Sequence, residues 1–167
     1  MPGLKRPLLV FGYGNPSRGD DALGSMLLER LEALHPPNAD LLTDFQLQVE
    51  HALDLHDRER ILFVDASVSC TAPYAFSRLY ARKDPSYTTH VMSPMAVLHT
   101  YRELYGDPPS AYLLEVRGNR FELGESLSPE ASVNLEAAYD LLRILCERPG
   151  TLDWEEFATA RVTGPDE

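Results

Sequence analysis

Three side chains that lie far apart in the sequence are of the types that bind a divalent metal ion. Asp21 follows a glycine-containing turn, Asp65 ends an apolar run, and His90 precedes a segment with helical periodicity. Two carboxylates and one imidazole suit zinc, nickel, manganese or iron, and they leave coordination positions open for water or for a substrate ligand. Each of the three side chains follows an expected strand or precedes an expected helix, which favours a common site.

Each of these residues also has a purely structural explanation, and the sequence leaves both readings open. Asp20 or Asp21 would cap the helix that follows, because acids are favoured at helix N-termini. Asp65 fits a turn or a cap. A lone histidine such as His90 in a connecting segment is usually a surface residue or one with satisfied hydrogen bonds. Spacing along the chain does not decide between these readings.

The glycine loop GYGNPSRGDD (12–21) does not fit the known phosphate-binding patterns. The dinucleotide fingerprint needs a third glycine where this chain has Ser17, and the P-loop needs a Gly-Lys pair that is absent. Helix N-termini attract phosphate, but Asp20 and Asp21 at that position would repel it. The loop therefore favours a turn that presents carboxylates. Asn15 fits either a role in fixing this turn or a hydrogen bond to substrate backbone.

Apolar runs and helical periodicities alternate along the chain. Buried or half-buried strands are expected at 8–14, 41–45, 61–67, 74–81 and 111–116, the fourth of them at a sheet edge. Helices are expected at 22–34, at 46–55 as a short one, from Ser93-Pro94 to Gly106, and from Ser128-Pro129 to Pro149-Gly150.

This alternation predicts an α/β fold, a three-layer sandwich with a mostly parallel sheet and helices on both faces. Ligand sites in such sheets form beyond the carboxyl ends of the strands. We expect one domain over residues 1–150 and a loosely held C-terminal tail over 151–167.

Composition narrows the function classes. The chain has 167 residues, 44% of them hydrophobic, and a formal net charge of −11. This charge disfavours nucleic acid and anionic membranes as partners, and no apolar run approaches the length of a membrane span. Cys70 and Cys146 are too far apart for a metal-binding CxxC motif. We expect a cytoplasmic monomer.

Several segments, in this order, resemble the hydrogenase maturation endopeptidases. The resemblance is carried by GYGNPSRGDDALG (12–24), TDFQLQVEHALDL (43–55), VDAS (64–67), THVMSP (89–94) and RGNRFELGESLSPEA (117–131), so it covers most of residues 7 to 147.

The resemblance implies a twisted five-stranded sheet between helices and a peptidase activity. Family members remove a C-terminal extension from the large subunit of nickel–iron hydrogenases after nickel insertion, and the substrate's nickel is the recognition element. Carried over by motif, the metal-binding and catalytic residues are Asp21, Asp65 and His90. His99 falls inside the following helix and out of register, whereas His51 with Glu50 would line the cleft without binding metal. No organic cofactor is implied.

The bond-breaking step and the function itself have alternatives. The chain lacks HExxH, so it is no ordinary zinc peptidase. A metal would polarise the scissile carbonyl and activate water, or Asp20 or Asp21 would act as general base. The same ligands would serve a chaperone that checks nickel in the large subunit without cutting it. A Rossmann-like nucleotide binder and a peptidase for another substrate are further alternatives, the latter disfavoured by the segment at 43–55.

Overall fold

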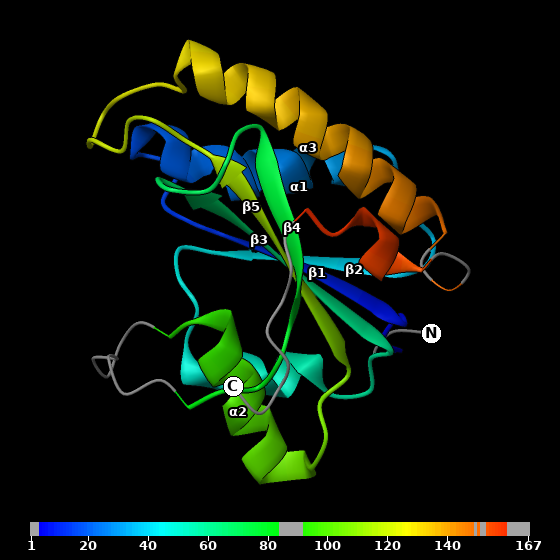
Figure 1. Cartoon of the computed structure of the whole chain (residues 1–167). Coiled ribbons are helices and arrows are strands. Elements are labelled where there is room, and N and C mark those ends of the chain that lie inside the picture. Colours follow the sequence, from blue (N-terminus) through cyan, green and yellow to red (C-terminus); the bar gives the residue numbers. More distant parts are fainter. Residues whose placement is uncertain (1–3, 84–91, 149, 151–152, 160–167) are drawn as a thin grey trace.

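The computed structural model describes residues 4–83, 92–148, 150 and 153–159. Five strands form one sheet in the order β2-β1-β3-β5-β4 (Figure 1). The strands are β1 (Leu8–Tyr13), β2 (Ala39–Asp44), β3 (Arg60–Ser67), β4 (Tyr74–Leu79) and β5 (Ser110–Arg117). The helices are η1 (Gly19–Ala22), α1 (Leu23–Ala33), η2 (Val49–Leu55), α2 (Pro94–Tyr105), α3 (Pro129–Glu147) and η3 (Trp154–Phe157), where η marks a 3-10 helix.

The predicted α/β class is confirmed, with helices on both faces of a mostly parallel sheet. Helices α1 and α3 cover one face, and α2 with η2 covers the other (Figure 1). Strands β2, β1, β3 and β5 run parallel, whereas β4 pairs antiparallel with β5 at the edge. The carboxyl ends of the four parallel strands therefore share one edge of the sheet, which we call the carboxyl edge.

Local sequence signals explain where the longer helices start. The Ser93 hydroxyl accepts a hydrogen bond from the Ala96 N–H, and the Ser128 hydroxyl accepts one from the Ala131 N–H. Each serine is followed by a proline at the first helical position, where the missing N–H costs nothing. Helix α1 differs, because neither it nor η1 has a side-chain cap. The capping role considered for Asp20 and Asp21 is therefore wrong.

Alternation along the strands divides the core into two apolar layers. One layer, under α1 and α3, includes Val10, Leu62 and Leu114. The other, under α2 and η2, includes Phe11 and Phe63. Because side chains alternate along a strand, a residue two positions beyond Phe63 lies on the α2 face. This alternation places Asp65 on the α2 face, at the carboxyl edge.

The described part of the C-terminal segment packs on the core, in contrast to the loosely held tail expected from the sequence. Trp154 is fully buried and its ring lies near those of Phe76 and Tyr112. The Thr159 N–H donates to the Phe76 carbonyl at 2.9 Å, so the segment also continues the hydrogen bonding of β4. Burial of the Trp154 ring and its aromatic contacts stabilise the segment in this position.

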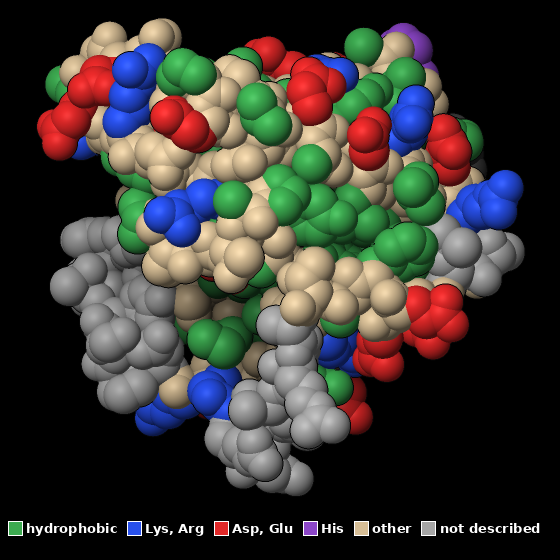
Figure 2. Space-filling model, turned by 45° about the horizontal axis from the view of Figure 1, so that its top comes forward, with side chains coloured by type: hydrophobic (Ala, Val, Ile, Leu, Met, Phe, Trp, Pro, Cys, Tyr) green, Lys and Arg blue, Asp and Glu red, His purple; other side chains and the backbone are tan. Residues whose placement is uncertain are grey.

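On the face that carries α3, acidic and basic side chains are interspersed around hydrophobic ones (Figure 2). The described part of that face therefore presents no continuous basic area of the kind that binds a nucleic-acid backbone. Among the described helices, none combines the length and the apolar character needed to cross a membrane.

Candidate functional site

Hydrogen bonds within the first loop place Asp21 at the carboxyl edge. The Asn15 N–H donates to Asp21 Oδ2 at 2.7 Å, and Asn15 Oδ1 accepts from the Ser17 N–H at 2.9 Å. Asn15 thus orders the turn with its side chain and orients Asp21 with its backbone. One Asp21 oxygen is held in this way, and the half-buried side chain keeps contact with solvent.

Gly14 is the residue that lets the loop close. Its φ is 143°, and a Cβ there would overlap the carbonyl oxygen of Asp21. We expect Gly14→Ala to lower the free energy of unfolding by about 3 kcal/mol, since both a strained φ and a backbone clash would be introduced. Urea denaturation followed by circular dichroism measures this change.

Gly124→Ala is the matched control. Gly124 also has a positive φ, 85°, but no atom lies within 4 Å of the position of a Cβ. It should cost only about 1 kcal/mol. Equal losses in the two variants would show that the contact between Gly14 and Asp21 does not matter.

Asp20 differs from its neighbour, because it is a fully buried structural carboxylate. Its oxygens accept hydrogen bonds from the N–H groups of Asn119, Arg120 and Ser128 and from the Ser128 hydroxyl, at 2.6 to 3.1 Å. Burial alone would raise the pKa of Asp20, but these hydrogen bonds outweigh it and lower the pKa below the ordinary value of 3.8. Asp20 joins the first loop to the start of α3, and its oxygens are not accessible for catalysis.

Asp65 lies near the end of β3, at the register of Glu115 in β5. Burial, together with the neighbouring charges of Asp21 and Glu115, raises the pKa of Asp65 to about 7, although the backbone of Ala66 and the Tyr13 hydroxyl donate hydrogen bonds that oppose the rise. The structure therefore brings Asp21 and Asp65 close enough to repel each other. A carboxyl group whose surroundings raise its pKa to near neutral pH is typical of a functional site.

Sequence reasoning missed two residues of this site, Tyr13 and Glu115. Tyr13 ends β1 and donates its hydroxyl to Asp65. Burial raises the pKa of Glu115, although a hydrogen bond from the Ser67 hydroxyl opposes this rise. A signal for Glu115 was present, because this acid stands late in an apolar strand just as Asp65 does. Aligning the two strands as parallel neighbours would have paired them.

Of the three predicted ligands, Asp21 and Asp65 lie near enough for the charge of Asp21 to raise the pKa of Asp65. His90 lies outside the described residues. Within the described ranges, no group of three His, Cys, Asp or Glu side chains is arranged to hold a metal ion. The two mutually repelling carboxylates have the charge and the oxygen donors that suit a divalent cation. A third ligand would have to come from His90 or from a substrate.

The other histidines of the predicted motifs have structural partners. His51 Nδ1 accepts the Gln48 N–H at 2.8 Å, and Nε2 lies 3.1 Å from Asp44 Oδ2. Because Nδ1 accepts, the hydrogen of neutral His51 is on Nε2 and is donated to Asp44. These contacts hold η2 beside the end of β2. His99 lies on α2, with Nε2 3.1 Å from Glu103.

Comparison with known proteins gives structural likenesses only. Neither a protein-family model nor a curated protein matches the sequence. The NiFe hydrogenase maturation protease HycI from Thermococcus kodakarensis is 21% identical with a TM-score of 0.68, and the alignment covers 87% of this chain and 95% of HycI. The hydrogenase maturating endopeptidase HybD from E. coli is 23% identical with a TM-score of 0.68, covering 88% and 94%.

A third solved structure, an endopeptidase from Escherichia coli, is 24% identical with a TM-score of 0.66, and the alignment covers 90% of this chain and 96% of that protein. The three alignments cover 87–90% of this chain and 94–96% of the other proteins. At this level of identity the likeness extends to the fold. The chain therefore has the fold of the hydrogenase maturation proteases HycI and HybD.

Proposed function

We propose that the protein is an endopeptidase that removes the C-terminal extension of a nickel–iron hydrogenase large subunit after nickel insertion. The observation that supports the proposal is the electrostatic effect of Asp21 on Asp65, which raises the pKa of Asp65 at the carboxyl edge of a sheet with the maturation-protease fold. Active sites of open α/β sheets form at this edge. The sequence motifs that resemble the maturation endopeptidases supply the same two residues.

The two carboxylates suit recognition of a metal that the substrate carries. Each negative charge disfavours the other, as the raised pKa of Asp65 indicates. A nickel ion bound to the large subunit supplies the positive charge that relieves this repulsion, with His90 as the proposed third ligand. A precursor without nickel lacks this attraction and instead meets an uncompensated negative site. The proposal thus links cleavage to completed metal insertion.

The hydrogen bonds of Asp20 and Asp21 support a choice of general base. Of the two acids considered, Asp20 has both oxygens occupied by buried hydrogen-bond donors. Asp21 is half-buried and has one oxygen held by the Asn15 N–H. We assign Asp21 as the carboxylate that accepts a proton from the attacking water. Asp65 accepts a hydrogen bond from the Tyr13 hydroxyl, which holds it in place, and it binds the substrate's nickel beside Asp21.

The proposal predicts nickel-dependent cleavage. Purified protein incubated with nickel-loaded large-subunit precursor should release the extension, seen as a shift in size on a denaturing gel. The same precursor prepared without nickel should be cut at least about 100-fold more slowly, since the central contact is absent.

Equal cleavage of the two precursors would contradict nickel recognition. A nickel-dependent complex with no change in precursor size, under conditions that keep both proteins folded, would instead identify a non-cleaving chaperone of the large subunit.

A further inference from the structure

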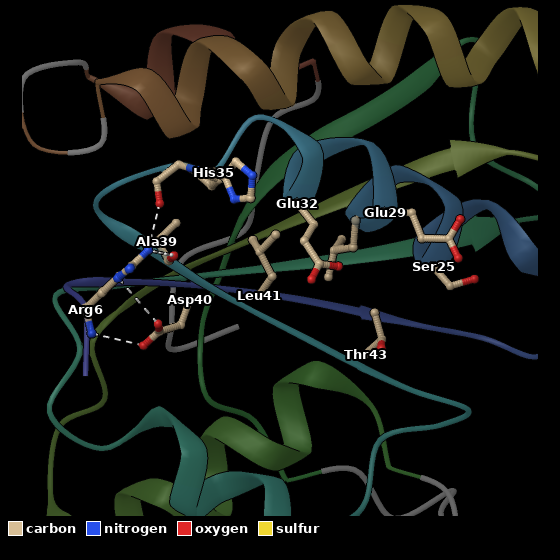
Figure 3. Close-up of a pocket in the computed structure, with 11 residues that line it drawn as sticks. Arg6, Ser25, Glu29, Glu32, His35, Ala39, Asp40, Leu41 and Thr43 are labelled. Carbon is tan, nitrogen blue, oxygen red and sulfur yellow. Dashed lines mark hydrogen bonds and ion pairs between the residues drawn. The ribbon is translucent and has the colours of Figure 1, made fainter. Parts of the chain in front are cut away.

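A groove whose lining includes neither Asp21 nor Asp65 runs between α1 and β2. It has a volume of about 470 Å³. Figure 3 shows the residues that line it. Glu29 and Glu32 of α1 form one wall, and Ala39, Leu41 and Thr43 of β2 form the other. The groove therefore combines an acidic wall with the side of a strand.

Strand β2 has an unpaired outer edge, since it is the terminal strand of the sheet beside β1. The Asn38 carbonyl accepts a hydrogen bond from the N–H of Leu8 in β1 at 3.2 Å, and the Asp44 carbonyl accepts one from the N–H of Gly14, directly after β1, at 3.1 Å. Pairing alternates along a strand, so the even-numbered residues of β2 face β1. The N–H and C=O groups of Leu41 and Thr43 consequently point outward. Such groups can pair with an added strand.

The start of this edge is already covered, which defines where an added strand can pair. The Arg6 guanidinium donates to the Ala39 carbonyl at 3.2 Å and to the Pro36 carbonyl at 2.9 Å. Figure 3 shows Arg6 and Asp40 at one end of the groove, with Ser25 and Thr43 toward the other. The open part of the edge is thus the half nearer the carboxyl end of β2.

The charges in the groove favour a basic ligand. Asp40 is neutralised by ion pairs with Arg6 and Arg58. Glu29 and Glu32 are both exposed, and neither forms an ion pair with any residue that the structure describes. A lysine or arginine on an added strand, pointing to the α1 side, would lie beside these two carboxylates.

We propose that this groove binds an extended basic peptide segment as an additional strand on β2. Backbone pairing with Leu41 and Thr43 would hold the segment, and Glu29 and Glu32 would select for basic side chains. The identity of this segment rests on the proposed function: it is the part of the large-subunit precursor that adjoins the cleaved bond. The geometry supports this, because β2 ends at Asp44, whose carbonyl accepts the N–H of Gly14 in the loop that holds Asp21.

Peptide binding tests the groove without requiring cleavage. The probe is a fluorescein-labelled peptide of alternating valine and arginine, blocked at both ends, and anisotropy is measured with the full chain. Wild-type protein should bind it, and the double variant Glu29→Lys/Glu32→Lys should bind about tenfold more weakly, because two attractions become repulsions. The same peptide with glutamate in place of arginine should not bind measurably.

Two further variants separate charge from backbone pairing. Glu147→Lys makes the control for charge, because Glu147 is an exposed acid at the end of α3 outside this groove, and it should bind as wild type does. Leu41→Pro removes an outward N–H while leaving the bonds to β1 in place, and it should also weaken binding about tenfold. Circular dichroism checks that each variant is folded. If Leu41→Pro does not fold, Glu29→Lys/Glu32→Lys alone tests the groove.

The outcomes distinguish this inference from the proposed function. With nickel-loaded precursor, Glu29→Lys/Glu32→Lys should raise KM about tenfold and leave kcat unchanged, as expected for loss of uniform binding. Unchanged peptide binding in this variant would contradict the proposal that the groove binds basic peptides. An unchanged KM with normal cleavage would contradict a role of the groove in substrate binding, while the protease function stands. Glutamate-dependent peptide binding by a protein that cuts no precursor would leave the groove established and the proposed function wrong.

Discussion

Asp65→Asn should abolish precursor cleavage and at the same time stabilise the fold at pH 8. In the proposed function Asp65 binds the substrate's nickel, so its loss would remove several kcal/mol of transition-state stabilisation, which corresponds to a fall in kcat/KM of at least about 1,000-fold. His90→Ala should cause a loss of similar size, in keeping with its proposed role as the third ligand. Gel analysis of cleaved precursor measures both losses.

The stabilisation follows from the raised pKa of Asp65. The ordinary pKa is 3.8 and the folded value is about 7. Below about pH 4 the group is protonated in both states and contributes no pH dependence. Between pH 4 and pH 7 the unfolded chain loses this proton while the folded chain keeps it, so the folded state loses stability as pH rises. Above pH 7 the loss is complete, at up to about 4 kcal/mol.

Asparagine has no charge to bury, so the variant avoids this cost. We expect Asp65→Asn to raise the melting temperature by roughly 10 °C at pH 8 and to leave it nearly unchanged at pH 4. Differential scanning calorimetry at the two pH values measures the difference. The control is Asp107→Asn, since Asp107 is exposed in the turn after α2. A similar destabilisation by Asp65→Asn at both pH values would show that Asp65 is a structural residue.

Much of the fold follows from short-range patterns in the sequence. Continuous apolar runs such as that of β3 predict buried strands, and Ser-Pro pairs mark the starts of α2 and α3. Asp65 was identifiable because a carboxylate at the end of such a run must lie at the carboxyl edge. The burial of Trp154 was not predicted, because its partners Phe76 and Tyr112 lie in strands far from it in the sequence.

The division of roles between Asp20 and Asp21 could not be predicted locally. Both acids lie in the first turn of the same 3-10 helix, and a capping argument treats them alike. What separates them is the segment around Asn119 and Ser128, about a hundred positions later, whose donors all converge on Asp20. Tyr13 and Glu115 were missed for a related reason, since only the register of β1, β3 and β5 places them beside Asp65.

The consecutive acids should respond in opposite ways to the same substitution. Asp20→Asn should lower the free energy of unfolding at pH 7 by about 3 kcal/mol, because an amide offers one acceptor oxygen and turns its N–H₂ toward backbone donors. Protein that remains folded should still cleave precursor within about tenfold of the wild-type rate. Asp21→Asn should leave stability at pH 7 unchanged or raised, because the charge of Asp21 raises the pKa of Asp65. Its cleavage rate should fall at least about 1,000-fold.

The pH dependence of the Asp20 effect adds a second test. The folded pKa of Asp20 lies below 3.8, so its contribution to stability is fully present above the unfolded value and disappears as pH falls through the folded value. The difference between wild type and Asp20→Asn in urea denaturation should therefore shrink in acid, whereas it should stay constant between pH 5 and pH 8 apart from effects common to both proteins. Equal losses of cleavage in the two asparagine variants, each with unchanged stability, would place Asp20 in the active site and contradict the division of roles. Because the two residues are adjacent and carry the same charge, only their different partners can explain a difference between the variants.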